Sequence, residues 1–92
     1  MAKEKQLTTS ERNLLTEYGI STEVHAPATT TRTNRFGGEP ISLNETAAAV
    51  YDQVIRMAEA YERGSQINVG KFDRLRYLFC KFWSKAYMDL LD

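Results

Sequence analysis

The sequence predicts an all-α protein: an antiparallel helical hairpin, preceded by a short N-terminal helix and a long extended arm. Apolar residues recur at helical spacing in two stretches, 43–61 and 72–82, a period that is typical of amphipathic helices. Capping signals precede two of the expected helices, and glycines follow them. We therefore assign residues 1–40 to the short helix and the arm, and residues 41–92 to the hairpin core.

Composition limits the classes of protein to which the chain can belong. Its 92 residues allow one domain. A chain of this length buries only about 60–65% of its unfolded surface, so we expect a partner or an oligomer to stabilise it. The 12 basic and 12 acidic residues cancel, which argues against general electrostatic binding to nucleic acid or to an anionic membrane. The single cysteine, Cys80, cannot form an internal disulfide and is expected to be a buried thiol.

The N-terminal helix is predicted over residues 9–18. Thr8 and Glu11 form a capping box, in which each side chain satisfies a backbone amide at the helix start. Gly19 supplies the left-handed residue that ends the helix. Because isolated helices shorter than about 12–15 residues are marginal in water, this helix must dock onto the rest of the chain.

Residues 21–40 break every periodicity. They include Pro27, Pro40 and the pair Gly37–Gly38, so no helix runs through them, and no strand pattern is clean. Connections of this length without structure are uncommon in compact domains and are usually functional segments or linkers. Two interpretations stay open: a flexible tether, or an extended arm that becomes ordered along a neighbouring protein.

The first hairpin helix is predicted over residues 43–63, between a second capping box, Ser42 with Glu45, and Gly64. Its apolar residues follow one stripe, and a second edge widens the apolar face. The stripe is Leu43, Ala47, Val50, Val54, Met57 and Tyr61, and the edge is Tyr51, Ile55 and Ala58. A face this wide predicts a helix packed between two neighbours. The same spacing also permits a homodimeric four-helix bundle.

The second hairpin helix is predicted to start near residues 69–70. Its stripe is Phe72, Leu75, Phe79 and Phe82, with Leu78 and Trp83 at the border, and the solvated positions off the stripe are Lys71, Arg74, Lys81 and Lys85. The short connection after Gly64 makes the two helices antiparallel. Ser84 is a candidate cap for a final segment, residues 85–91. Whether the helix bends there or runs straight through stays open.

The sequence shows no recognisable constellation for catalysis, cofactor binding or metal binding. His25 is the only histidine, so neither a histidine metal cluster nor a histidine-dependent triad can be built from this chain alone. The glycines do not form a phosphate-binding loop. Asp73 and Arg76 are expected to form a surface ion pair. We therefore expect no enzymatic activity and no cofactor.

Nucleic acid and membrane are not the expected partners. Basic residues interleave with Tyr77 and Trp83 in the last third of the chain, as they do in proteins that follow phosphates and stack bases. Because the aromatic residues of this segment fall largely on the core stripe, we expect them to fill a core instead. No apolar run approaches the ~18 residues needed to span a bilayer.

Protein partners are expected to contact the arm and the outer edge of the first hairpin helix. Phe36 is the predicted anchor of the arm, with Arg32 and Arg35 as polar contacts. Tyr51 and Ile55 are the predicted contacts on the helix.

Three segments carry a family resemblance: Thr33–Gly38 reads TNRFGG, Phe72–Phe79 reads FDRLRYLF and Ala86–Asp92 reads AYMDLLD. In combination they resemble a group of small proteins encoded by tailed bacteriophages, cyanophages included. The resemblance runs from about Thr33 to the end of the sequence and leaves the N-terminal helix and the threonine-rich stretch outside. It implies a phage origin and assigns no role.

Two hypotheses follow for that role. In the first, the chain is a virion component that decorates the capsid or seals a joint of the portal or tail, and its arm becomes ordered along neighbouring subunits. In the second, it is an early host-takeover factor that binds and inhibits a bacterial enzyme or defence complex. The predicted partners are accordingly other phage proteins or a second copy of the chain, with a host protein as the alternative. The predicted location is the virion, after synthesis in the host cytoplasm.

Overall fold

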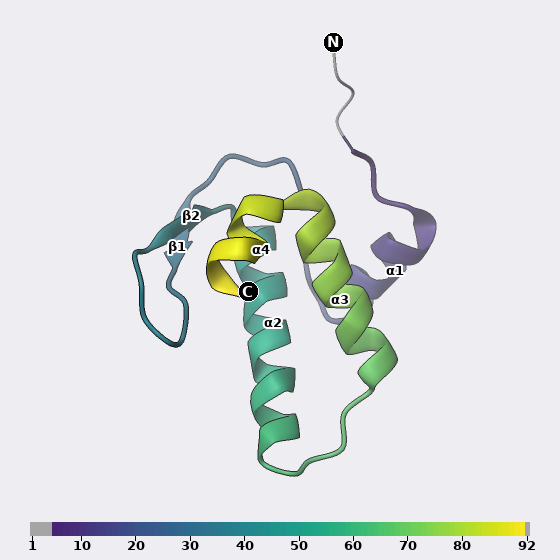
Figure 1. The fold of residues 1–92 in the computed structure, drawn as a ribbon. Helices are drawn as coiled ribbons and strands as arrows, with labels where there is room; N and C mark the ends of the chain where they lie inside the picture. Colours follow the sequence, from purple (N-terminus) through teal and green to yellow (C-terminus); the bar gives the residue numbers. More distant parts are fainter. Residues whose placement is uncertain (1–4, 92) are drawn as a thin grey trace.

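The computed structural model describes residues 5–91, and within them the chain forms four helices and a small antiparallel sheet (Figure 1). In chain order the elements are α1 (Thr9–Glu17), β1 (Thr30–Arg32), β2 (Ile41–Leu43), α2 (Glu45–Glu62), α3 (Val69–Phe82) and α4 (Ser84–Leu90). Residues 1–4 and 92, which belong to the two predicted regions, lie outside the described part. No helix within residues 5–91 combines the length and the apolar character needed to cross a membrane.

The predicted helical hairpin is confirmed. Figure 1 shows α2 and α3 side by side and running in opposite directions, joined by one short connection. The predicted α2 stripe is buried from Leu43 to Met57, whereas Tyr61 is 65% exposed. Because α2 packs against α3 on one side and against both strands on the other, its wide apolar face is used within one chain. The buried stripe is therefore not available for the homodimeric four-helix bundle that its spacing permits.

The predicted capping box at the start of α2 is wrong. Ser42 belongs to β2, where it lies opposite Thr31, and the cap is Asn44, whose Oδ1 accepts a hydrogen bond from the amide of Ala47 at 2.7 Å. Both serine and asparagine are good cap residues. Because Ser42 is paired in the sheet, the helix begins after Asn44 instead. Asn44 is also buried, at 6% exposure.

Helix α3, in the C-terminal third of the chain, contributes three fully buried side chains to the core. Leu75, Leu78 and Phe79 are fully buried, and the predicted stripe residues Phe72 and Phe82 lie at its edges, packed against it. The buried face of α3 is therefore centred on Leu75, Leu78 and Phe79, and the predicted stripe residues Phe72 and Phe82 lie at its border. The chain bends after α3 at Trp83, whose φ of −137° is not helical. α4 then turns back toward β2 (Figure 1).

Cys80 and Ser84 differ from their predicted roles. The Cys80 thiol is free and only partly buried, so it is more exposed than the core thiol that we expected. Ser84 is the first residue of α4 and makes no side-chain cap, because the N-cap position is Trp83.

The prediction of an extended arm is wrong, and so is the prediction of a purely α-helical fold. The segment between α1 and α2 folds back over the body, and its two strands pair in the register Thr30↔Leu43, Thr31↔Ser42 and Arg32↔Ile41. The two strands are short and lie at either end of an eight-residue loop, so they left no alternating pattern in the sequence. β-branched threonine suits such strands.

Side chains from α2 and from the cap residues of α2 and α3 hold the same segment in place. Asn44 Nδ2 donates to the carbonyls of Val24 and Ala26, at 3.1 and 3.0 Å, and Trp83 Nε1 donates to the Val24 carbonyl at 3.3 Å. The Tyr51 hydroxyl donates to the Thr33 carbonyl at 3.3 Å. Each donor is remote in sequence from its acceptor, which is why reading local patterns suggested a free arm.

Helix α1 docks on α3 as its predicted marginal stability requires. The Thr8–Glu11 capping box is present in both directions, and Leu14 and Leu15 are buried in the common core. At one end the Lys81 ammonium donates to Glu11 at 3.0 Å, and at the other end Lys71 pairs with Glu17. Lys71 and Lys81 were predicted to be solvated; instead they make ion pairs, and the Lys81 side chain is only 22% exposed.

The Glu11 carboxylate at the start of α1 makes the stability of the fold dependent on pH. Partial burial acts to raise the pKa of Glu11, but hydrogen bonds from Thr8 and Lys81 outweigh it and lower the pKa below the ordinary value of 4.5. The folded state therefore holds the carboxylate more strongly than the unfolded state does. The resulting stability is complete above about pH 4.5 and is lost as the pH falls through the lower, folded-state pKa.

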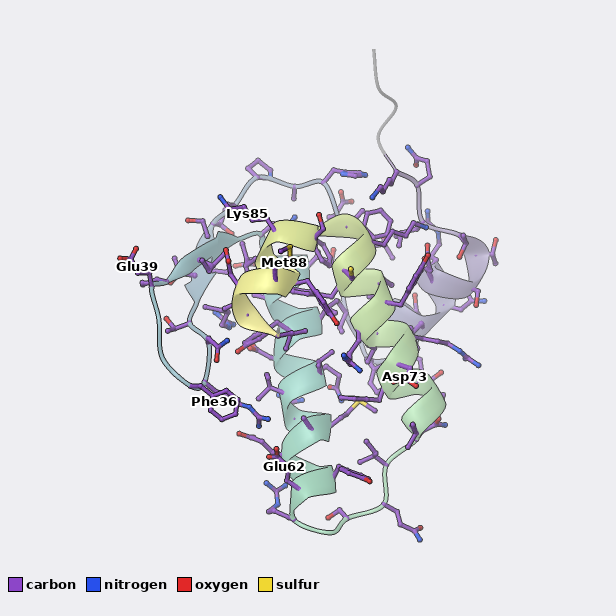
Figure 2. The ribbon with its side chains drawn as sticks, viewed as in Figure 1. Phe36, Glu39, Glu62, Asp73, Lys85 and Met88 are labelled. Carbon is purple, nitrogen blue, oxygen red and sulfur yellow. The ribbon has the colours of Figure 1, made fainter. Side chains whose placement is uncertain are left out.

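We accordingly expect Glu11→Gln to be less stable than the wild type at neutral pH and the difference to shrink as the pH falls below 4.5. Urea unfolding at a series of pH values measures this difference. The matched control is Glu39→Gln, because Glu39 is an exposed carboxylate in the loop between the strands (Figure 2). A Glu11→Gln difference that stays constant across the acid range would contradict the assigned role.

Candidate functional site

Arg32, one of the predicted partner contacts, is engaged within the chain. Its Nε and Nη2 donate to the two carboxylate oxygens of Asp52 at 2.9 and 2.8 Å, and Nη1 donates to the Thr31 carbonyl at 2.8 Å. The hydrogen bonds with Asp52 raise the pKa of Arg32 above its ordinary value. A bidentate pair of this kind fixes direction as well as distance, so Arg32 ties β1 to α2.

Tyr51, the second predicted contact, lies inside the fold. The side chain is 5% exposed, and its ring centroid is 6.2 Å from that of Phe79. Burial raises the pKa of Tyr51. Arg32 and Tyr51 thus make extensive contacts within the chain. A role for them in partner binding stays a prediction.

The other three predicted contacts, Arg35, Phe36 and Ile55, come together around one groove. We call it the upper groove; its volume is about 240 Å³, and α2, α3, α4 and the loop between the strands line it. Phe36 is 85% exposed at its edge, and Figure 2 shows its side chain beside the lower half of α2. The loop between the strands therefore holds an aromatic ring in water beside this groove.

Polar contacts hold the Phe36 loop in shape. Arg35 donates to both oxygens of Glu62, at 3.2 and 3.0 Å, and its guanidinium carbon lies 4.9 Å from the centre of the Phe36 ring. Asn34 Oδ1 accepts from the Phe36 amide at 2.8 Å, and Asn34 Nδ2 donates to the Asp89 carbonyl at 3.2 Å. The loop that carries Phe36 is therefore fixed at its base by α2 and by α4.

The glycine pair lets the chain turn directly after Phe36. Gly37 and Gly38 have φ values of 105° and 126°, in a region that residues with a side chain rarely adopt. The Gly37 amide closes the turn on the Asn34 carbonyl at 2.8 Å. Phe36 thus projects from a tight, glycine-dependent turn.

A second groove, not predicted from the sequence, lies next to the first. This lower groove has a volume of about 290 Å³ and lies between the C-terminal end of α2 and the start of α3. It is lined by Ala58, Tyr61, Glu62, Ile67, Val69, Phe72 and Asp73. Tyr61 and Val69 are 65% and 54% exposed. Because Ala58 and Phe72 line both grooves, the two grooves adjoin one another.

The two grooves differ in charge. The ionised residues that line the upper groove are Arg35 and Arg76, whereas those that line the lower groove are Glu62 and Asp73. Within the chain these charges are paired across the boundary, Arg35 with Glu62 at 3.0 Å and Arg76 with Asp73 at 3.8 Å. The latter is the predicted surface pair, and it is confirmed. The arginines therefore line the upper groove and the carboxylates the lower one, and each arginine is paired with a carboxylate.

This surface is suited to binding an apolar or mixed protein surface, because an aromatic anchor and apolar walls are framed by charges of both signs. In residues 5–91 no group of three or more histidine, cysteine, aspartate or glutamate side chains is placed to hold a metal ion. Across the same residues every buried side-chain nitrogen and oxygen has a hydrogen-bond partner. Searches with the chain against protein-family models, curated proteins and solved structures returned no match.

Proposed function

We propose that this chain is a small accessory protein of a tailed bacteriophage virion, acting by protein–protein assembly through the upper groove and Phe36 and not by catalysis. The observation that carries the proposal is Phe36, which is 85% exposed on a loop held at its base. Aromatic side chains in such positions supply large contact area with few rotatable bonds, and they dominate binding energy at interfaces.

The phage setting is proposed from the sequence resemblance, and the arrangement of its segments supports the choice of surface. Each of the three resembling segments contributes to the upper groove: Phe36 from the first, Phe72 and Arg76 from the second, and Leu90 and Leu91 from the last. Segments that are distant in sequence thus meet at one place. A shared role for the group at this groove would explain why those segments look alike.

The mode of binding that we propose is docking of a preformed loop. The earlier expectation, an arm that becomes ordered on its partner, required a free segment, and residues 20–40 are instead held on the body by Asn44, Tyr51 and Trp83. A loop already in its bound shape loses less conformational entropy on association than a free segment does. The virion partner would therefore meet Phe36 as part of a rigid surface.

The test is quantitative mass spectrometry of purified particles carrying either the wild-type chain or Phe36→Ala. Truncation of an aromatic anchor typically costs about 2 kcal/mol or more, which is about 30-fold in affinity, so we expect the variant to be strongly depleted from particles. A wild-type copy number close to that of the major capsid protein would indicate capsid decoration, and a few copies would indicate the portal or tail.

The matched control is Tyr77→Ala, which removes another exposed aromatic ring, at 69% exposure, outside both grooves. It should enter particles as the wild type does. If the wild-type chain is absent from purified particles, the virion role is wrong, and the host-directed inhibitor becomes the function to pursue.

A further inference from the structure

We propose that the first partner of this surface is a second copy of the chain: a two-fold symmetric dimer in which the upper groove of each copy faces the lower groove of the other. This inference rests on the proposed function, since it names a partner for the same loop. In the dimer each Phe36 packs beside Tyr61 of the other copy, at the C-terminal end of α2.

The apolar side chains that the fold leaves in water favour this pairing. Five large hydrophobic residues within the described part of the chain are exposed, and Phe36, Tyr61 and Val69 of these line the two grooves. The upper groove contributes a projecting ring, and the lower groove a hollow of about 290 Å³ with apolar walls. A surface that carries both a projection and a matching hollow can bury both at once in a two-fold interface, because each is used twice.

Charge favours the same arrangement. When the upper groove of one copy faces the lower groove of the other, Arg35 and Arg76 meet a surface lined by Glu62 and Asp73. Placing two upper grooves together would instead bring like charges face to face, which is unfavourable. In this arrangement Arg35 lies close to Glu62 of the other copy as well as to its own, so opposite charges are neighbours both within and between the copies.

The first arm of the test measures the dissociation constant of the dimer by sedimentation over a range of concentrations. We expect the wild type to be dimeric. Phe36→Ala should raise the dissociation constant about 1,000-fold, because each dimer loses two rings and an anchor of this kind is typically worth about 30-fold. Tyr77→Ala and Met88→Ala remove exposed residues outside both grooves and should leave the constant unchanged.

The second arm uses charge reversal. Arg35→Glu alone and Glu62→Arg alone each place like charges across the interface twice, so each variant should be monomeric at concentrations where the wild type is dimeric. Mixed in equal amounts, the two variants restore opposite charges at both contacts and should form a heterodimer. Contacts within a chain cannot produce this rescue, because each variant keeps its like-charged pair in the mixture.

A wild type that is monomeric at every concentration overturns the dimer, as does a dimer that Phe36→Ala leaves intact or a mixture that fails to associate. None of these results decides the virion proposal, which depends on the presence of the chain in particles. Loss of Phe36→Ala from particles with a monomeric wild type would place a different protein on this surface.

Discussion

Replacing Phe79 by alanine is expected to lower the free energy of unfolding by about 3–5 kcal/mol, the usual cost of removing a buried aromatic ring. Phe79 is fully buried, and its ring lies between Tyr51 and Trp83, with centroid separations of 6.2 and 5.5 Å. Domains of this size have total stabilities of roughly 5–14 kcal/mol. The variant should therefore lose between about one fifth and nearly all of the original stability.

Urea unfolding followed by far-ultraviolet circular dichroism measures the change. The matched control is Tyr77→Ala on the same helix, where the ring is 69% exposed and the expected cost is within about 0.5 kcal/mol. The helix propensity changes in a similar way in both variants, so the difference between them reports burial. Equal costs for the two variants would show that Phe79 does not belong to the core.

Replacing Asn44 by alanine is expected to cost about 3 kcal/mol, because one side chain makes three hydrogen bonds: about 1 kcal/mol for the cap and a similar amount for each of the others. The cap bond to the Ala47 amide and the two donations to Val24 and Ala26 are all lost. Asn44→Ser keeps a cap acceptor for the Ala47 amide and loses the amide group that donates to Val24 and Ala26, so it separates the two contributions.

Asn44→Ala should loosen the segment before β1 as well as lower the free energy of unfolding. Without the donations the segment before β1 is held less firmly, and we expect trypsin to cut Asn44→Ala faster at Arg32 and Arg35. The control is Asn68→Ala, since Asn68 caps α3 through the Lys71 amide at 3.0 Å but is exposed. It should cost about 1 kcal/mol and leave the trypsin rate at these two sites unchanged. An unchanged rate in Asn44→Ala would mean that other contacts hold the segment.

The helices could be predicted from the sequence because their signals are local. The capping box of α1 spans Thr8 to Glu11, and the stripe of α2 repeats within each turn, so both are legible without knowledge of the partner. The sheet and the folded-back segment could not be predicted in this way. Strands of three residues show no alternation, and the donors that fix the segment lie up to 59 residues from their acceptors.

The candidate surface was predicted in part for the same reason. Phe36 and Ile55 stood out as an apolar residue in a polar segment and as the outer edge of a helical stripe, and both line the upper groove. The lower groove was missed because its lining depends on where α2 and α3 diverge at their connection. Tyr61 continues the buried stripe in sequence, yet it is 65% exposed in the fold.

The docking of α1 on α3 sets the order in which the elements can pack during synthesis. The partners of Glu11 and Glu17 lie 70 and 54 residues further along the chain, so α1 leaves the ribosome with Leu14 and Leu15 uncovered. At the usual ~5–20 residues per second they wait for several seconds before α3 is available. Helix α1 thus cannot complete its packing until α3 has been released. During that interval Leu14 and Leu15 are exposed apolar surface, the kind that chaperones cover and that aggregates bury.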